Sequence, residues 1–190
     1  MAVRPADRYG PSALLTPANL VSIVRLAISP VFFLLILRDE TSWLALACWI
    51  ALAATDFVDG LLARRHGTTR SGAFLDPLAD KVLVLGALCV LAASGRFAWL
   101  PVLLIAFREL GISYYRAQLG RQGLAVPART TAKVKTVVQE IAVGLALAPF
   151  TVDQPVLADT ALWISVVLAL YSGAQYLIDG RSAATTLGHR

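Results

Sequence analysis

The stretch from Thr55 to Lys81 reads TDFVDGLLARRHGTTRSGAFLDPLADK and carries aspartates at 56, 59, 76 and 80 between two long apolar runs. Charge at the edge of a bilayer is costly, so it commonly has a function. The rest of the chain makes a bilayer the relevant environment, because 57% of its 190 residues are hydrophobic and only 15% are charged. This composition, with a mean hydropathy of +0.68, predicts an integral membrane protein.

Apolar runs long enough to span a bilayer recur along the whole sequence. A span needs roughly 20 residues, and six candidates lie at about 20–37, 42–60, 77–94, 98–116, 134–151 and 159–178. Short connections between them predict one all-α domain, a bundle of six transmembrane helices over residues 17–178. Residues 1–16 would form an N-terminal juxtamembrane segment and residues 179–190 a cytoplasmic tail.

Two Pro-containing pairs predict where helices begin. Thr16 and Pro17 suit the N-cap and first position of the first helix, and Asp76 and Pro77 suit the same positions of the third.

The positions of the cations predict the orientation in the membrane. If both termini are cytoplasmic, Arg38 and Arg96 are the main cations left outside, and a dozen others lie inside: Arg4, Arg8, Arg64, Arg65, Arg70, Arg116, Arg121, Arg129, Lys133, Lys135, Arg181 and Arg190. This distribution follows the positive-inside rule. Trp43, Trp99 and Trp163 then fall at the outer ends of the second, fourth and sixth spans, where an interfacial belt is expected. The +5 net charge indicates contact with anionic membrane lipids rather than with nucleic acid.

The aspartate spacing predicts a metal site. On helices, Asp56 and Asp59 share one face, as do Asp76 and Asp80. If the second and third helices pack side by side, four carboxylates converge at the cytoplasmic end of the bundle. Converging carboxylates repel one another unless cations lie between them. Hard oxygen ligands select Mg²⁺, Mn²⁺ or Ca²⁺ over zinc, and the arrangement suits two divalent ions.

The residues between the acids suit a phosphate-bearing ligand. Gly60, Ala63 and Gly72 would let the backbone approach a bulky group closely. Arg64 offers a planar fork for phosphate oxygens. The alternative is that the acids pair with neighbouring cations in a solvated loop, but ordinary ion pairs do not require this fixed spacing.

The pattern D56-x2-D59-G60-x2-A63-R64-x7-G72-x3-D76-x3-D80 resembles the signature of the CDP-alcohol phosphatidyltransferase family, six-helix membrane enzymes of phospholipid synthesis. The resemblance implies that an alcohol displaces CMP from a CDP-linked lipid. It implies that Asp56, Asp59 and Asp76 bind two Mg²⁺ or Mn²⁺ ions, with Asp80 beside them as a further ligand and the catalytic base. The CDP-lipid would be held by a set of five residues: Asp56, Gly60, Ala63, Arg64 and Gly72.

The second half of the chain bears on the acceptor alcohol. The segments FLDPLADKVL, AFREL and VPARTTAKVKTVVQ resemble the subgroup that uses CDP-diacylglycerol and glycerol 3-phosphate to form phosphatidylglycerophosphate. Ala132 departs from the glycine expected before the first lysine of its KxKT motif. A phosphorylated acceptor needs cations beside the metals, and the candidates are Lys133, Lys135, Arg129, Arg108 and Arg116. Each of these could instead be a topology marker.

Other functions remain open at this stage. A cardiolipin synthase of the CDP-alcohol type would use phosphatidylglycerol and would not need these cations, whereas a phosphatidylinositol phosphate synthase would need them. From another class, a divalent-cation transporter predicts carboxylates spread through the membrane depth rather than gathered at one end. Gly144 and Ala148, four apart on the fifth span, leave a homodimer open. Arg25 and Glu109 lie within spans, so we expect each to face the bundle interior or a polar cavity, joined by Asn19 near the start of the first helix.

Overall fold

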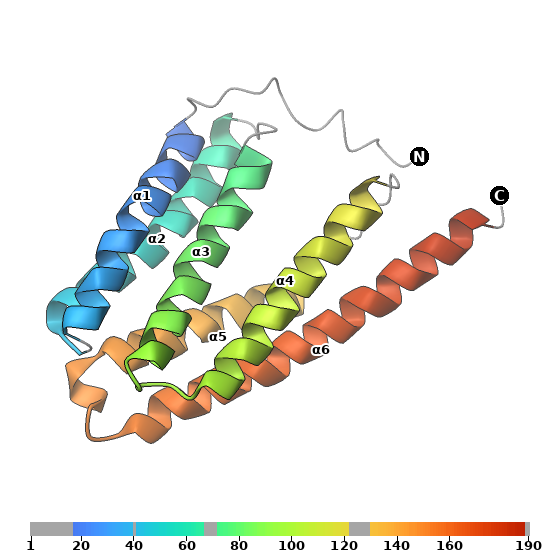
Figure 1. The fold of residues 1–190 in the computed structure, drawn as a ribbon. Helices are drawn as coiled ribbons and strands as arrows, with labels where there is room; N and C mark the ends of the chain where they lie inside the picture. Colours follow the sequence, from blue (N-terminus) through green and yellow to red (C-terminus); the bar gives the residue numbers. More distant parts are fainter. Residues whose placement is uncertain (1–16, 40, 67–71, 122–129, 189–190) are drawn as a thin grey trace.

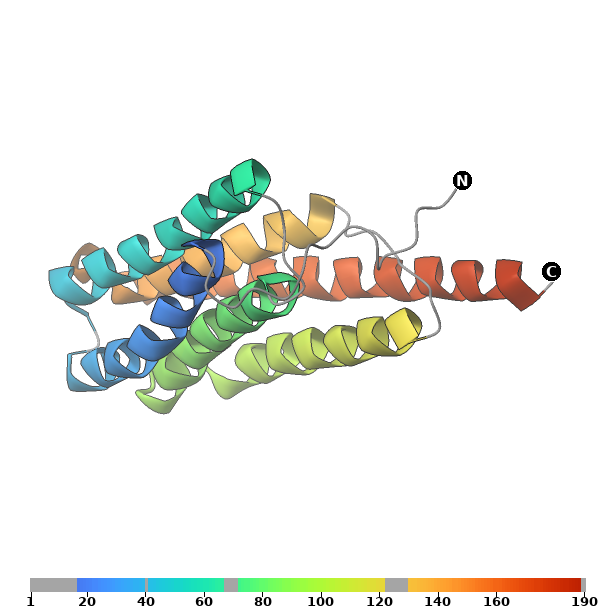
Figure 2. The ribbon, with the colours of Figure 1, turned by 90° about the horizontal axis from the view of Figure 1, so that it is seen from above.

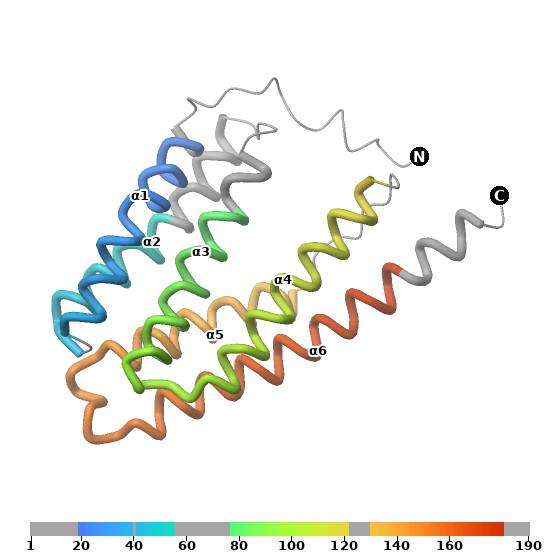
Figure 3. The backbone as a smooth tube through the Cα atoms, in the orientation of Figure 1, coloured from blue at the N-terminus to red at the C-terminus, as the bar shows by residue number. Residues whose placement is uncertain are grey.

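The computed structural model contains six α-helices in its described parts: α1 (Pro17–Arg38), α2 (Trp43–His66), α3 (Gly72–Ala93), α4 (Trp99–Arg121), α5 (Thr130–Leu147) and α6 (Pro155–Gly188), with a short 3₁₀ helix η2 (Pro149–Thr151) before α6. The structure describes the backbone of residues 17–39, 41–66, 72–121 and 130–188, and side chains within 19–39, 41–55, 77–121 and 130–180 (Figure 3). The predicted all-α class and the six predicted helices are confirmed.

Several helix boundaries differ from the predicted spans, most clearly the start of α3 and the end of α6. The first helix begins at Pro17 as predicted, but the third begins at Gly72 with Pro77 inside it, so the prediction that Asp76 and Pro77 start the helix is wrong. Pro77 is the sixth residue of α3, just beyond the first four N–H groups that lack intrahelical partners, so it removes one backbone bond of the early helix, the one to the carbonyl of Ala73. At the other end of the chain, α6 continues to Gly188, past the apolar run that ends near 178. The length of an apolar run limits the span but does not limit the helix.

Successive helices run in alternating directions, so α1, α3 and α5 end on one side of the bundle and α2, α4 and α6 begin there (Figure 1). Helix α1 packs against α2 and α3, and α6 packs against α4 and α5 (Figure 2). Helix α5 also contacts α2 and α3 and thereby joins the two groups. The interior therefore has α3, α4 and α5 meeting near its middle.

The interior is apolar toward the side where α1, α3 and α5 end. Phe32 stacks on Trp49 with ring centroids 5.8 Å apart, and the indole Nε1 of Trp49 donates to the carbonyl of Glu140 at 3.0 Å. Ile36, Leu88 and others complete one buried cluster. Burying such side chains contributes roughly 1.5–3 kcal/mol each. The buried charged residues Arg25 and Lys135 lie toward the opposite side, where α1, α3 and α5 begin, whereas buried Thr151 lies on the apolar side.

The turn after α3 shows how the helix ends on the apolar side are closed. Gly95 has a φ of 87°, its N–H donates to the carbonyl of Ala92, and the N–H of Arg96 donates to that of Leu91. This is a Schellman motif, which needs a residue in the left-handed region that glycine adopts without strain. The Arg96 side chain then donates to the carbonyls of Ala146 and Thr151, so this predicted outer cation ties α3 to the end of α5.

The small pair Gly144 and Ala148 lies inside the bundle. A Cβ at Gly144 would meet the Trp49 ring at 3.5 Å, and Ala148 is only 1% exposed. Their spacing therefore serves packing within one chain.

The bundle exposes an unusual amount of apolar surface. Phe107 is 82% exposed, Val156 70% and Val31 66%. Within the described residues, Asn19–Arg38 and Pro155–Gly180 are long and apolar enough to cross a membrane, by length and composition. Large exposed apolar patches mark protein or membrane contacts.

Candidate active site

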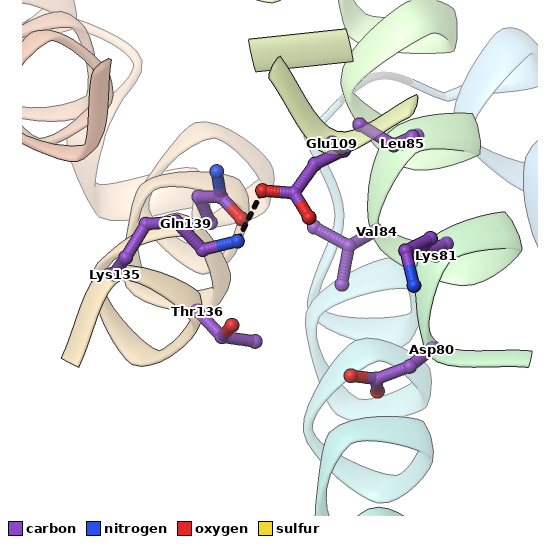
Figure 4. A pocket seen from close by; sticks show the side chains of 8 residues that line it. All are labelled: Asp80, Lys81, Val84, Leu85, Glu109, Lys135, Thr136 and Gln139. Atoms are coloured by element: carbon purple, nitrogen blue, oxygen red, sulfur yellow. Dashed lines mark hydrogen bonds and ion pairs between the residues drawn. The ribbon is translucent and has the colours of Figure 1, made fainter. Parts of the chain in front are cut away.

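A pocket lies where α3, α4 and α5 meet on the polar side of the interior (Figure 4). Facing stripes of α3 and α5 form its walls, and Glu109 of α4 lies between them. The lining residues are Asp80, Lys81, Val84, Leu85, Glu109, Lys135, Thr136 and Gln139. Asp80, the predicted base, and Lys135, a predicted phosphate-binding residue, therefore line one pocket from different helices.

Arg25 organises the Asp80 side of this region. Its side chain is 1% exposed; Nη1 lies 3.8 Å from Oδ1 of Asp80, and Nε donates to Oγ1 of Thr55 at 3.1 Å. A charge buried in this way requires partners. One side chain of α1 thus joins α2 and α3 at one level. It brings Thr55, which directly precedes Asp56, into the neighbourhood of Asp80.

Glu109 organises the other side of the pocket. Its Oε1 accepts from Lys135 Nζ and from Arg108 Nη1 at 2.8 Å. Arg108 is held in turn by α6, because its Nε donates to the carbonyl of Ala169 at 2.9 Å and its Nη2 to Ser172 Oγ at 2.7 Å. These contacts link α4, α5 and α6 through buried charges. Each ion offsets the desolvation of its neighbours.

The comparisons with known proteins identify the family. The CDP-alcohol phosphatidyltransferase profile matches residues 15–171. The chain belongs to the CDP-alcohol phosphatidyltransferase family. It is 36% identical over 166 residues to a probable phosphatidylglycerophosphate synthase of Mycobacterium tuberculosis, covering 84% of this chain and 79% of that protein.

For two further relatives, the match to this chain covers a larger share of the relative's own length. The CDP-diacylglycerol–glycerol-3-phosphate 3-phosphatidyltransferase of Bacillus subtilis is 34% identical, over 88% of this chain and 96% of that protein. The protein of that name from Pectobacterium atrosepticum is 38% identical, over 86% of this chain and 93% of that protein. The chain is therefore an enzyme of a membrane-bound, generally metal-dependent phosphatidyltransferase family.

The predicted acceptor-binding cations of this phosphatidyltransferase occupy different environments. Lys135 lines the pocket and is only 4% exposed, so its ammonium faces the interior of the bundle rather than the surface. Lys133, two residues earlier on α5, is exposed. Arg108 points to α6, and exposed Arg116 lies over the Tyr176 ring with its guanidinium 5.4 Å from the centroid. Arg129 lies outside the described residues.

The predicted metal and CDP-lipid residues lie on the two helices that Arg25 joins. The side chains of Asp56, Asp59, Ala63, Arg64 and Asp76 lie outside the described residues, as do the surroundings of Gly60 and Gly72. The backbone is helical at all seven positions, so the aspartate spacings do fall on helices. Asp76 lies one helical turn before Asp80, and Asp56 follows Thr55.

The exposure and ligand chemistry of Asp80 bear on whether a metal ion fits this site. Its side chain is 30% exposed, and a carboxylate oxygen is a hard ligand of the kind that Mg²⁺ and Mn²⁺ prefer. Among the described residues, no three acidic, His or Cys side chains gather as a metal site. A site at this junction would therefore need the neighbouring aspartates of α2 and α3 together with Asp80, and the donor chemistry fits that requirement.

The pairings of the buried charges were not evident from the sequence. For the pairing of Arg25 with Asp80, the sequence offers one signal, which is that the two residues lie at the same distance along their helices. Arg25 lies eight residues after the start of α1 and Asp80 eight after the start of α3, which is about 12 Å along each helix from the same side. Gln139 and Thr136 were not predicted as site residues. Gln139 lies four residues beyond Lys135 and therefore on the same face of α5, and Thr136 lies one residue beyond it, beside that face.

Proposed function

We propose that this chain transfers the phosphatidyl group of CDP-diacylglycerol to glycerol 3-phosphate, giving phosphatidylglycerophosphate and CMP. The names of the relatives from Bacillus subtilis and Pectobacterium atrosepticum support both substrates. The observation that carries the proposal is the shared pocket, where the carboxylate of Asp80 and the ammonium of Lys135 face one cavity from α3 and α5. A hydroxyl acceptor with an anionic phosphate requires this combination of a base and a cation.

The enzyme crosses the cytoplasmic membrane six times, with both termini and the pocket on the cytoplasmic side. The exposed apolar surface and the two long apolar helices support this placement. Trp43, Trp99 and Trp163 are each at least 45% exposed, and Trp43 and Trp99 are the first residues of α2 and α4. Both helix starts lie on the side opposite the pocket, which suits an outer interfacial belt.

Asp56, Asp59, Asp76 and Asp80 would hold two divalent ions, Mg²⁺ or Mn²⁺. When bound, these ions would supply neutralisation of the diphosphate and stabilisation of the leaving CMP. Asp56 and Arg64, with the close backbone approach allowed by Gly60, Ala63 and Gly72, would hold the CDP-lipid.

Asp80 also takes the proton of the attacking glycerol hydroxyl. The hydroxyl oxygen forms the new bond to the phosphatidyl phosphorus, and the bond from that phosphorus to CMP breaks. Lys135 holds the acceptor phosphate. Because Glu109 already binds the Lys135 ammonium, the ammonium is positioned in the pocket before the acceptor arrives. Fixing a binding group in advance reduces the entropy lost on binding.

CMP release by the purified protein in detergent tests this function. CDP-diacylglycerol and Mg²⁺ are supplied with glycerol 3-phosphate, inositol 1-phosphate, myo-inositol, serine or phosphatidylglycerol in separate reactions, each with an EDTA control. Among the five acceptors, we expect CMP release only with glycerol 3-phosphate, and we expect EDTA to abolish that release. Preference for phosphatidylglycerol or inositol 1-phosphate would keep the site and replace the acceptor. No release with any acceptor, from folded protein, would contradict the proposal and favour a divalent-cation transporter.

A further inference from the structure

Gln139 lines the pocket, and the proposed roles leave its side-chain amide unused. Its side chain is 2% exposed, it lines the pocket one helical turn beyond Lys135 (Figure 4), and its amide Nε2 has no hydrogen-bond partner among the described residues. A buried donor without an acceptor is unfavourable, and native proteins contain few. A ligand oxygen in the pocket would satisfy this donor.

Apart from Thr136, whose hydroxyl already donates to the carbonyl of Ala132 at 3.3 Å, the other polar groups of the pocket differ from Gln139 in charge. Lys135 is a cation and suits an anionic phosphate, and Asp80 is a carboxylate that accepts protons. Gln139 is neutral and donates without adding charge, so its suitable partner is a neutral oxygen such as a hydroxyl. Lys135 and Gln139 are four residues apart on one face of α5, so their side chains are neighbours.

We propose that Gln139 is a specificity-determining residue, whose Nε2 donates to the acceptor hydroxyl that does not react. This inference rests on the proposed function, in which glycerol 3-phosphate is the acceptor. That molecule carries a reacting hydroxyl, a second hydroxyl and a phosphate. The pocket offers Asp80, Gln139 and Lys135 for these three groups, so an acceptor that lacks the second hydroxyl leaves the Gln139 donor unpaired.

The test compares glycerol 3-phosphate with 3-hydroxypropyl phosphate, which keeps the reacting hydroxyl and the phosphate and lacks the middle hydroxyl. For the wild-type enzyme, we expect kcat/KM to be at least about tenfold higher with glycerol 3-phosphate, because the analogue leaves a buried donor unsatisfied. Gln139→Met keeps a side chain of similar length and removes the amide. In that variant the ratio should fall toward one, and KM for CDP-diacylglycerol should stay unchanged.

A matched control applies the same substitution elsewhere. Gln118 lies on α4 outside the pocket lining, and its Nε2 donates to the hydroxyl of Tyr114 at 2.8 Å. Gln118→Met should keep the wild-type ratio. An unchanged ratio in Gln139→Met would overturn the assignment.

The wild-type enzyme alone also decides the question if Gln139→Met does not fold. Equal use of the two acceptors by the wild type would overturn the role of Gln139 and leave the proposed function intact. No CMP release with glycerol 3-phosphate in the same assay would instead contradict the proposed function, and this inference would fall with it.

Discussion

Asp80 and Glu109 are carboxylates of the same pocket, but their contacts differ. Glu109 is 12% exposed and binds two cations directly, Lys135 and Arg108. Asp80 is 30% exposed, and the guanidinium of Arg25 lies 3.8 Å away, beyond ordinary hydrogen-bond distance. Glu109 is thus held in a network that joins three helices, whereas the more exposed Asp80 lines the pocket from α3. This difference leads us to expect that Glu109 serves stability and Asp80 serves chemistry.

Asp80→Asn should give the largest effect. The amide cannot take the proton of the acceptor hydroxyl, and loss of a general base lowers turnover by roughly 10²–10⁴-fold. We expect CMP release to be nearly abolished while binding of CDP-diacylglycerol remains measurable. Full activity in this variant would refute the assignment of Asp80 as the base.

Glu109→Gln should instead lower stability. The substitution leaves Lys135 and Arg108 buried without their carboxylate, and removing one partner of a buried ion pair costs about 3–5 kcal/mol. Thermal unfolding in detergent should show a clear fall in Tm, with turnover per folded molecule reduced far less than in Asp80→Asn. Asp153→Asn, at an exposed carboxylate before α6, is the control and should keep the wild-type Tm. A Glu109→Gln variant with normal Tm and abolished turnover would contradict the assignment of Glu109 to stability rather than to chemistry.

Lys135→Ala affects the surroundings of both carboxylates, because Lys135 contacts Glu109 and lines the pocket with Asp80. Loss of a charge-assisted contact to phosphate should raise KM for glycerol 3-phosphate by about tenfold or more, since such hydrogen bonds contribute roughly 1.5–3 kcal/mol. KM for CDP-diacylglycerol should change far less. Exposed Lys133 provides the contrast, and Lys133→Ala should raise the acceptor KM by less than Lys135→Ala. Equal changes in both KM values for Lys135→Ala would argue against an acceptor pocket.

The lengths of the apolar runs predicted the fold well, since six runs of span length correspond to six helices. Sequence pattern gives the position of a residue along a helix but not which neighbour it faces. Arg25 was recognised as a buried charge, yet its contact with Asp80 depends on α1 lying against both α2 and α3. In sequence, Lys135 fits a topology marker equally well, and only its burial beside Glu109 distinguishes it from one. The preference of proline for the first position of a helix predicted the wrong start for α3, because α3 continues in the N-terminal direction past Pro77 and such local preferences are weak relative to the surrounding structure.

Gly86→Ala gives the smallest effect and tests whether packing and chemistry separate along one helix. Gly86 lies on α3 six residues beyond Asp80, and a Cβ there would come within 2.2 Å of the Phe33 ring. Overpacking typically costs about 1–3 kcal/mol, so Tm should fall while both KM values stay unchanged. Gly144→Ala is the matched control: its Cβ would meet Trp49 at an ordinary 3.5 Å, and stability should change by less than about 1 kcal/mol. A changed acceptor KM in Gly86→Ala would mean that packing near the apolar end of α3 also positions Asp80, and that stability and chemistry are coupled along this helix.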